Sequence, residues 1–506
     1  MRILFLTGAP LRQGPSGATS DIASARYRVL IPATHLARRG HSIQVMSLQP
    51  GETPREALEA QADVAIFAKS FSESNERLAV HLRERGMRVI ADYCDDHFEH
   101  PQHGPHFLRM AQAATDLVAS TEVLAASIKR HTGRDARVIT DPVEGPRGTP
   151  RFEPRLPALR IAWFGHPSNL VSVIDKADEL KALAQRMPVE FTLVTERSPE
   201  VERLAGAIAA ILPDRLKVRA AAWSLDTTWS VLEQCDLVWI PVTDSGPKMA
   251  KSPNRLLEAL WAGRLVVADP VPAYRPFEDL MPLGLGLEAG VMQALQDPQD
   301  VVRRVREAQR RVARSHSGFE CGRQWATACG DSSAPALKLN LGCGDKILAG
   351  YVNVDVVEAR AGMKPDVICD LHDLAPFEDA SADEILSVHV VEHFWRWEIR
   401  DVLREWIRVL KPGGRMIVEC PNILSAAQDL LQSPVEAARE GQSGQRTMWV
   451  FYGDPKWKDP LMIHRWGYTP ESLRELLAEA GLRDVRQEPA QFKAREPRDM
   501  RVVGVK

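Results

Sequence analysis

The sequence has few of the features that mark a secreted, membrane-spanning or nucleic-acid-binding protein. Its seven cysteines are an odd number, lie far apart and include no C-x-x-C pair, which argues against a disulfide framework or a zinc site. No apolar run approaches the ~18 residues of a membrane span, and the start, MRILFLTGAP, fits a first β-strand better than a signal peptide. Lysine and arginine (64) nearly balance aspartate and glutamate (67), which gives nucleic-acid binding no support. We expect a cytoplasmic protein without an integral membrane segment, and peripheral association with the inner face of the membrane stays open.

The 506 residues are too many for one hydrophobic core and suggest about three domains. Short apolar runs alternate with longer amphipathic ones, which is typical of parallel sheets crossed by helices. A Pro- and Gly-rich connection at residues 141–157 and a small-residue linker at residues 329–336 divide the series. The predicted fold class is therefore α/β, with domains over residues 1–150, 151–330 and 337–506. In the first domain, strands are expected at Ile3–Leu6, Ile43–Ser47, Val64–Ala68, Arg88–Ala91, Leu117–Ser120 and Val138–Thr140.

The stretch LKLNLGCGDKILAGYVNVDV, residues 337–356, has the pattern of a strand, a glycine turn and a second strand. Gly342 and Gly344 would let the backbone turn sharply and let a ligand lie against main-chain N–H groups. Asp355 ends the second strand, where a doubly wound fold holds two ribose hydroxyls, although a helix cap is the alternative. A third glycine is missing and Asp355 comes sooner than the ~20 residues of a dinucleotide site. The pattern predicts an adenosine-like ligand rather than a pyrophosphate cradle.

Four later segments, DVICDLHDLAPF, ILSVHVVEHF, LREWIRVLKPGGRMIVECPN and HRWGYTPESLRELLAEAGL, follow in order. With them, residues 337–506 resemble a class I S-adenosylmethionine-dependent methyltransferase of the small-molecule type. The resemblance implies a Rossmann-like domain with S-adenosylmethionine as its cofactor. The residues that it implies for binding are Gly342, Cys343 and Gly344 beside the methionine part, Asp355 at the ribose, and Asp370 with Leu371 at the adenine.

The segment HVVEHF places polar residues at helical spacing beside the expected acceptor pocket. His393 could accept a proton from a hydroxyl at neutral pH, and it could equally cap or pack the start of the following helix. His464, in MIHRWGY, is a similar candidate. Methyl transfer to a sugar hydroxyl needs mainly alignment and a modest base, so either histidine is a candidate catalytic residue.

Residues 1–329 show two alternating series joined by the Pro-rich connection, and they resemble a GT-B glycosyltransferase. The sharper pattern is K-x-x-N-R-x-x-E within residues 244–271, which resembles the nucleotide-sugar site of family-four-like glycosyltransferases. A helix N-terminus offers free N–H groups and positive potential to a diphosphate. The resemblance implies a nucleotide-diphosphate sugar as donor, and the alternative is an exposed helical face of salt bridges. The candidate donor-binding residues are Lys251, Asn254, Arg255 and Glu258.

One departure from that family concerns the position eight residues before Glu258. Many relatives carry a second glutamate there, and this chain has Ala250. Either Lys251 and Asp244 take over its role, or the domain has lost transfer activity.

The segment DYCDDHFEHPQHGPH repeats histidine at every third residue from His97 to His106. Two prolines break the helix that would gather these side chains, so no metal is expected. We interpret Asp96 and His97 as candidate catalytic residues that meet the acceptor or donor sugar, with a solvated loop as the alternative. Arg26 and Arg28, in a loop and helix after the first strand, could be counter-charges for donor phosphate.

The sequence thus predicts a bifunctional enzyme. Its first two domains would transfer a sugar from a nucleotide-diphosphate donor to a glycan or lipid-linked glycan, and its third would methylate a glycan hydroxyl, in bacterial surface-polysaccharide assembly. In the runner-up interpretation the first two domains are a non-catalytic glycan- or nucleotide-binding module. In a third interpretation the methyl acceptor is a protein or a lipid.

Overall fold

The computed structural model describes residues 1–14, 17–49, 51, 53–154, 158–243, 246–331, 336–435, 445–492 and 497–506. The chain divides into two compact units, unit 1 at Met1–Asp331 and unit 2 at Ser332–Lys506. None of the helices in the described ranges has the length and hydropathy of a membrane span.

The first sheet of unit 1 is parallel and has the strand order β4-β1-β5-β6-β7-β8. Its strands are nearly continuous apolar runs, as expected for a sheet covered by helices on both faces. The prediction from the sequence is confirmed at every strand of this sheet, and β5 has the predicted bounds. The strands are β1 (Arg2–Thr7), β4 (Ser42–Ser47), β5 (Val64–Ala68), β6 (Arg88–Tyr93), β7 (Asp116–Ala119) and β8 (Arg137–Val138). The helices α4 (Glu73–Glu84), α5 (Gly104–Ala113) and α6 (Glu122–Thr132) connect them.

The second sheet of unit 1 is also parallel, with the order β11-β10-β9-β12-β13. Its strands are β9 (Leu159–Phe164), β10 (Val189–Thr195), β11 (Leu216–Ala222), β12 (Leu237–Ile240) and β13 (Leu265–Ala268). The helices around it include α8 (Ala177–Arg186), α9 (Pro199–Ala209), α10 (Leu225–Gln234), α12 (Asn254–Trp261) and α13 (Leu287–Gln296). Residues 141–154, between the two sheets, contain no helix or strand, which agrees with the predicted connection.

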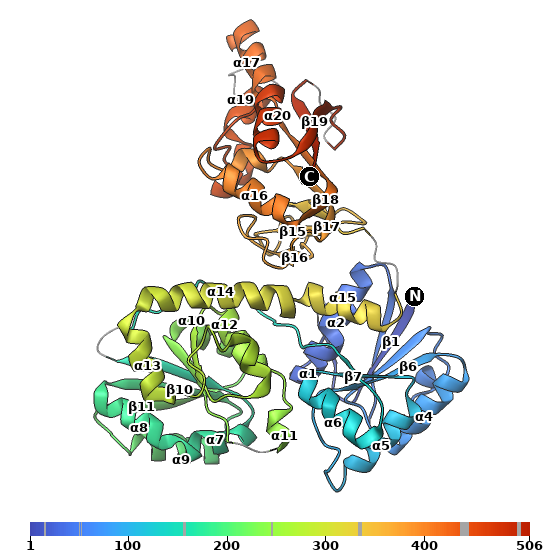
Figure 1. Cartoon of the computed structure of the whole chain (residues 1–506), viewed down its shortest axis with the longest axis vertical. Helices are drawn as coiled ribbons and strands as arrows, with labels where there is room; N and C mark the ends of the chain where they lie inside the picture. Colours follow the sequence, from blue (N-terminus) through green and yellow to red (C-terminus); the bar gives the residue numbers. More distant parts are fainter. Residues whose placement is uncertain are drawn as a thin grey trace. The chain divides into compact units, whose positions relative to one another are not determined.

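Two helices at the end of unit 1 return the chain from the second sheet to the first. The helix α14 (Pro298–His316) packs against α12, and α15 (Gly318–Ala328) packs against α2 (Ile31–Arg38) beside the first sheet, as Figure 1 shows. Trp325 of α15 is fully buried in the core of the first sheet, where its ring meets Phe5 edge-on at 6.1 Å. The first core therefore includes residues from the far end of the unit.

A π-helical turn interrupts the helical stretch after the first strands. Arg26–Leu30 form this turn, η1, between α1 (Ala23–Ala25) and α2. Such turns insert one extra residue into a helix and occur often at functional sites. Here the turn buries Arg26, Tyr27 and Arg28 in unit 1.

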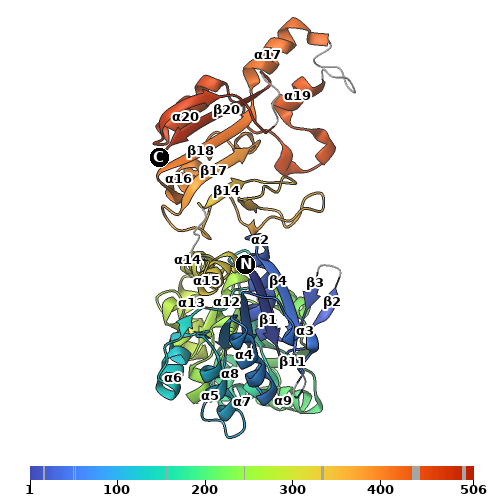
Figure 2. The same ribbon diagram turned by 90° about the vertical axis from the view of Figure 1, so that its right-hand side faces the viewer.

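Unit 2 is built on a seven-stranded sheet with the order β16-β15-β14-β17-β18-β20-β19. Five strands are parallel neighbours: β14 (Lys338–Leu341), β15 (Val352–Asp355), β16 (Val367–Ile368), β17 (Ala382–Val388) and β18 (Leu410–Pro421). At the other edge β20 (Asp499–Val505) runs antiparallel between β18 and β19 (Arg483–Glu488) (Figure 2). The helices include α16 (Ile399–Val409), α17 (Ile423–Gln432), α19 (Gln445–Tyr452) and α20 (Pro470–Glu479). A doubly wound sheet with one reversed strand confirms the predicted α/β fold class for unit 2.

Candidate functional site

The glycine turn after β14 is shaped by two features that exclude a side chain. Gly342 has φ 69°, a left-handed conformation, and a β-carbon there would lie 2.5 Å from Cγ2 of Val390. Gly344 is also left-handed, with φ 55°. Because Val390 lies just after β17, the close contact brings the end of β17 against the turn after β14. The turn therefore presents bare backbone beside the segment that carries His393.

Asp355 closes the turn from the next strand. It is only 7% exposed, and its two oxygens accept hydrogen bonds from the backbone N–H groups of Gly344 at 2.7 Å and Val357 at 3.2 Å. These bonds fix the carboxylate at the end of β15, next to the turn. Each carboxylate oxygen can accept a second hydrogen bond, so the arrangement fits a ligand with ribose hydroxyls.

The remaining cofactor-binding candidates lie along the same edge of the sheet. Asp370 is exposed and accepts hydrogen bonds from the backbone N–H and from Nδ1 of His372, at 3.0 and 2.8 Å. Leu371 is buried, and its carbonyl accepts a hydrogen bond from Trp406 Nε1 at 2.9 Å. Cys343 is buried in the glycine turn, and burial raises the pKa of its thiol to about 12, so it is neutral. Together with Asp355 these groups fit S-adenosylmethionine.

His393 and His464 come together, although 70 residues separate them in the sequence. Their rings lie 5.0 Å apart, centroid to centroid. Nδ1 of His393 donates to the Ile463 carbonyl at 3.0 Å, and Nδ1 of His464 donates to the Val450 carbonyl at 2.9 Å. A carbonyl oxygen can only accept, so each neutral ring must carry its proton on Nδ1 and a lone pair on Nε2.

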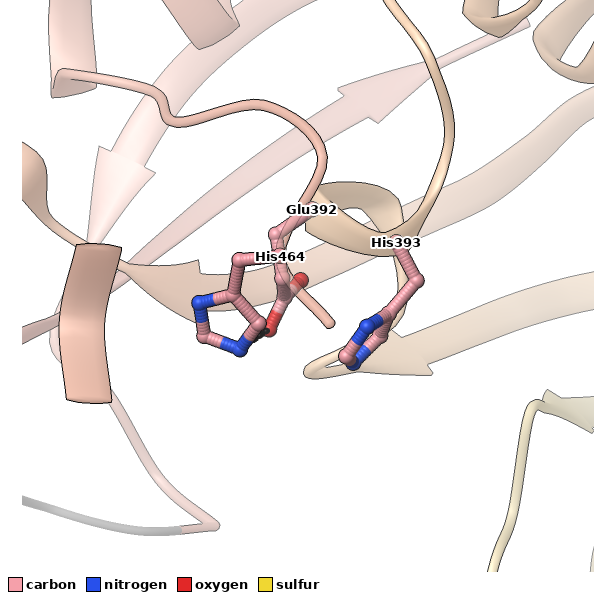
Figure 3. A group of neighbouring side chains, drawn as sticks. All are labelled: Glu392, His393 and His464. Carbon is pink, nitrogen blue, oxygen red and sulfur yellow. Dashed lines mark ion pairs between the residues drawn. The ribbon is translucent and has the colours of Figure 1, made fainter. Parts of the chain in front are cut away.

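Glu392 completes the cluster, and the sequence analysis missed its role. It is 2% exposed, and Figure 3 shows its carboxylate between the two imidazole rings. Its Oε1 lies 3.4 Å from His389 Nδ1 and 3.9 Å from His464 Nε2. Burial alone would raise the pKa of Glu392, but His389, His393 and His464 outweigh burial and hold it at about 2. The position of Glu392 directly before His393 was the feature of the sequence that could have indicated its role in the cluster.

A cavity of about 440 Å³ borders this cluster. Ile463, whose carbonyl holds His393, lines it, and so does Gly453, where a β-carbon would lie 3.4 Å from the His464 ring. The buried Nε1 of Trp449 has no hydrogen-bond partner among the described residues. The lining consists of Met448, Trp449, Tyr452, Gly453, Asp454, Pro455, Lys458, Asp459, Pro460, Met462 and Ile463.

Exposed tryptophans lie on both chain segments that build the cluster. Trp395 and Trp397 stack with their rings 4.9 Å apart, and Trp397 is 72% exposed. Trp466 is also exposed, and its backbone N–H donates to the Glu392 carbonyl at 3.2 Å. Arg465 lies over the Trp395 ring at 5.4 Å, which joins the two segments.

In unit 1, Glu258 of α12 meets the π-helical turn. The Tyr27 hydroxyl donates a hydrogen bond to its Oε1. Burial raises the pKa of Glu258 to about 7, against the opposing effects of Tyr27 and Arg26. A carboxylate with a pKa near neutrality and a tyrosine partner is a typical functional-site arrangement.

The other donor-binding candidates fall into three situations. Arg255 has a buried Nη1 atom without a hydrogen-bond partner among the described residues, so an acceptor of the phosphate kind would satisfy it. Asn254 is engaged already, because its Nδ2 donates to Asp141 at 2.9 Å. Lys251 is exposed at the start of the helix. Asp244 lies outside the described residues.

Ala250 is part of the hydrophobic core of the first sheet, with 1% exposure. Its carbonyl accepts a hydrogen bond from the Thr121 hydroxyl at 2.8 Å. A glutamate at this position would face a packed core instead of a sugar. The missing carboxylate is thus replaced by a packing contact between the two halves of unit 1.

The two early arginines, Arg26 and Arg28, are both engaged in ion pairs within unit 1. Arg28 is 1% exposed and pairs with Asp92 and Asp141, so it is not available to a phosphate. Arg26 pairs in the same way with Glu144 at 2.9 Å. These ion pairs fix the π-helical turn rather than a ligand.

Asp96 and His97 follow β6, as expected, and both are partly buried. The carboxylate of Asp96 accepts the backbone N–H of Phe98 at 3.4 Å, and burial lowers the pKa of His97. Asp95 pairs with Lys69, an ion pair that the sequence analysis missed. His106 pairs with Glu76 at 2.6 Å and is therefore separate from His97.

Comparisons with known proteins found one family model and several similar solved structures. A family model for a methyltransferase domain matches residues 339–418. No curated protein matches the chain. Among solved structures the chain is similar to TarM of S. aureus (14% identity, TM-score 0.42), covering 53% of this chain and 54% of that one. It is also similar to AviGT4, a glycosyltransferase involved in avilamycin A biosynthesis (14%, TM-score 0.41, 65% and 97%).

A third solved structure, a SAM-dependent methyltransferase from Archaeoglobus fulgidus, is 17% identical, with a TM-score of 0.24 and coverage of 36% and 92%. This chain spans about half the length of TarM. The family model thus identifies a methyltransferase domain in unit 2, which confirms that prediction from the sequence.

Proposed function

We propose that this protein is a bifunctional enzyme that methylates a glycan hydroxyl with S-adenosylmethionine and transfers a sugar to the same class of glycan. The observation that carries the methylation half is the contact between Gly342 and Val390. This contact puts the bare glycine turn beside the cluster of Glu392 and His393. A cofactor site and a group of proton-handling side chains thus share one edge of the sheet.

The residues divide the work of methylation. S-adenosylmethionine supplies an electrophilic methyl group when it is bound. Asp355 and the turn at Gly342 would hold the ribose and methionine parts, and Asp370 would bind on the adenine side. The Nε2 lone pairs of His393 and His464 would be the groups that act on the acceptor hydroxyl. Burial lowers the pKa of His393, so the ring is neutral and able to act on a hydroxyl proton at neutral pH.

A glycan acceptor is supported by the surroundings of the cluster. Sugar rings present apolar C–H faces and polar hydroxyl edges, so they suit exposed aromatic rings combined with hydrogen-bond donors. Trp395, Trp397 and Trp466 supply exposed rings, and beside the cavity Trp449 supplies an Nε1 that has no hydrogen-bond partner in the ranges that the structure describes. We assign the acceptor to the glycan class for this reason, with surface polysaccharide as the setting.

Sugar transfer is assigned to unit 1 on the strength of α12. Arg255 offers a buried guanidinium nitrogen that donates to no group in the described part of the chain, and Glu258 offers a carboxylate that accepts a hydrogen bond from Tyr27. In a nucleotide-diphosphate sugar, the diphosphate would bind Arg255 and two ribose hydroxyls would bind Glu258. The burial of Ala250 favours a second candidate function, in which unit 1 binds the nucleotide or glycan without transferring a sugar.

Product analysis tests this proposal directly. Full-length protein is incubated with methyl-¹³C S-adenosylmethionine and separate polysaccharide, protein and lipid fractions, and the products are examined by NMR. We expect an O-methyl signal in the polysaccharide fraction alone. Labelling confined to protein or lipid would reject the glycan assignment. Binding of UDP, GDP and ADP to the parent protein and to Arg255→Gln tests the donor half.

A further inference from the structure

The cluster of Glu392, His393 and His464 carries lone pairs that hydrogen bonds among the three side chains do not use. Both Nε2 atoms carry lone pairs, because each Nδ1–H is fixed on a backbone carbonyl. Histidines that bind a metal show this same pattern, in which the outer nitrogen donates to a carbonyl and sets the tautomer. The backbone carbonyls thus fix the orientation of both rings, and each ring keeps a lone pair on Nε2.

Glu392 adds a buried anion to these lone pairs. Neither of its carboxylate oxygens accepts a hydrogen bond within the described part of the chain, although the residue is 2% exposed. The 3.4 Å contact with His389 is an ion-pair distance rather than a well-formed hydrogen bond. A buried carboxylate without a direct hydrogen-bond donor can take a cation as its partner.

The geometry points to a divalent transition-metal ion bound by Glu392, His393 and His464. One ligand atom from each residue lies within 4.8 Å of the others (Figure 3). Three ligand atoms bound to one ion at about 2.1 Å lie about 3.0–3.6 Å apart, so the widest pair must approach by about an ångström, which rotation of the side chains about their χ angles can supply. The sequence analysis expected no metal from the cysteine spacing and the histidine-rich segment, and it did not pair Glu392 with His464, which are 72 residues apart in the chain.

The chemistry of the three ligands selects the ion. Two imidazoles and one carboxylate suit Zn²⁺, Fe²⁺, Mn²⁺ or Co²⁺, whereas Mg²⁺ and Ca²⁺ prefer sites made of oxygen atoms. Three protein ligands leave coordination positions for other groups, as in catalytic rather than structural metal sites. The competing arrangement is a proton on His464 that pairs with Glu392 across 3.9 Å.

The open positions would hold the acceptor, and this part of the inference rests on the proposed function. A sugar hydroxyl bound to the ion becomes more acidic and releases its proton to water. Its oxygen then attacks the methyl carbon, so that the O–C bond forms as the S–C bond breaks. The products are a methyl ether and S-adenosylhomocysteine. The ion would then activate the oxygen, and His393 and His464, which are assigned to the acceptor hydroxyl above, would act on it through the ion that they bind.

Metal binding is measurable without any glycan. Full-length protein is stripped with a chelator and titrated calorimetrically with Zn²⁺ and with Mg²⁺, and Co²⁺-loaded protein is examined for visible absorption bands. We expect one equivalent of Zn²⁺ bound much more tightly than Mg²⁺. Glu392→Gln and His464→Gln should each weaken Zn²⁺ binding roughly 10- to 100-fold or more. Unchanged S-adenosylmethionine affinity shows that each variant is folded, and Glu392→Asp should bind Co²⁺ with shifted bands.

A second histidine group provides the control. The rings of His100 and His103 lie 4.4 Å apart in unit 1, exposed to solvent, where they are apt to bind stray metal. The variant His100→Gln/His103→Gln should keep the full Zn²⁺ equivalent. The metal site is overturned if this variant loses the metal, if Glu392→Gln keeps it, or if the parent protein binds none.

Activity assays distinguish metal binding from a role of the metal in methyl transfer. Chelation should lower methyl transfer at least tenfold, and added Zn²⁺ or Mn²⁺ should restore it. Full methylation by metal-free protein would overturn the role in catalysis. Metal bound as expected, with no glycan methylated, would uphold the metal site and reject the proposed acceptor.

Discussion

Val390 occupies the space that a β-carbon on Gly342 would need, at 2.5 Å. Gly342→Ala should therefore combine left-handed strain of about 1–2 kcal/mol with overpacking of about 1–3 kcal/mol. We expect lower stability of unit 2 and loss of S-adenosylmethionine binding, measured by denaturation and calorimetry.

Gly413→Ala is the matched control for this change. Gly413 has a similar φ of 79°, but a β-carbon there would meet no atom within 4 Å. Gly413→Ala should lose only the stability that corresponds to the left-handed strain, and it should keep its affinity for S-adenosylmethionine. The double variant Gly342→Ala/Val390→Ala should recover part of the lost binding; equal effects of Gly342→Ala and Gly413→Ala would refute the steric explanation.

Asp355→Asn should weaken S-adenosylmethionine binding by about 1.5–3 kcal/mol, because hydrogen bonds to the ribose hydroxyls lose their charged acceptor. The amide oxygen can still accept from Gly344, so the domain should stay folded. Asp345→Asn removes a partly exposed carboxylate in the same turn, paired with Lys346 at 3.0 Å, and should leave the affinity unchanged. Calorimetry that finds both variants alike would remove Asp355 from the site.

Glu258 predicts a pH dependence in unit 1. Burial raises its pKa from 4.5 to about 7, so in this window the folded protein holds a proton that the unfolded chain has released. Stability should therefore fall as the pH rises from 4.5 to about 7. Nucleotide affinity should rise over the same window, because ribose hydroxyls donate to the ionised carboxylate.

In the variant Glu258→Gln, neither the fall in stability nor the rise in nucleotide affinity over this pH window should occur. In Tyr27→Phe the midpoint should move to higher pH, because the Tyr27 hydroxyl no longer stabilises the charged form. Nucleotide titrations at pH 5, 6, 7 and 8 test these expectations. A flat affinity profile in the parent protein would separate Glu258 from nucleotide binding.

Much of the fold follows from patterns that are local in the sequence. The apolar run Val64–Ala68 specifies β5 to the residue, because a strand buried on both faces needs consecutive apolar side chains. The glycine turn and Asp355 likewise lie within one short strand–turn–strand segment. Resemblance to a family then supplied the cofactor.

The parts that the sequence did not predict depend on contacts between distant segments. Trp325 packs in the first core because α15 returns to it, and no periodicity shows that return. Glu392 meets His464 only when the loop after α19 folds back on η4 (Val391–His393). Ala250 could be identified as a missing carboxylate, but its burial in the first core needed the structure.

Trp397 is predicted to act on glycan binding rather than on stability. It is 72% exposed and stacks on Trp395, so Trp397→Ala should cost little folding free energy. Its loss should raise KM for the glycan while kcat stays nearly constant, because the ring binds ground state and transition state alike. Leu285→Ala, at a 49% exposed apolar side chain in unit 1, is the control and should leave KM unchanged. Equal kinetics for the parent and Trp397→Ala would remove the stacked pair from the acceptor site.

The central claim is that one chain adds a sugar and a methyl group to the same glycan. Full-length protein is incubated with a defined glycan pool, a panel of nucleotide-diphosphate sugars and methyl-¹³C S-adenosylmethionine, and single product chains are sequenced by tandem mass spectrometry. We predict product chains that carry both the transferred sugar and the labelled methyl, on that sugar or its neighbour. Methyl label found only on chains without a transferred sugar, or on protein, would contradict the claim.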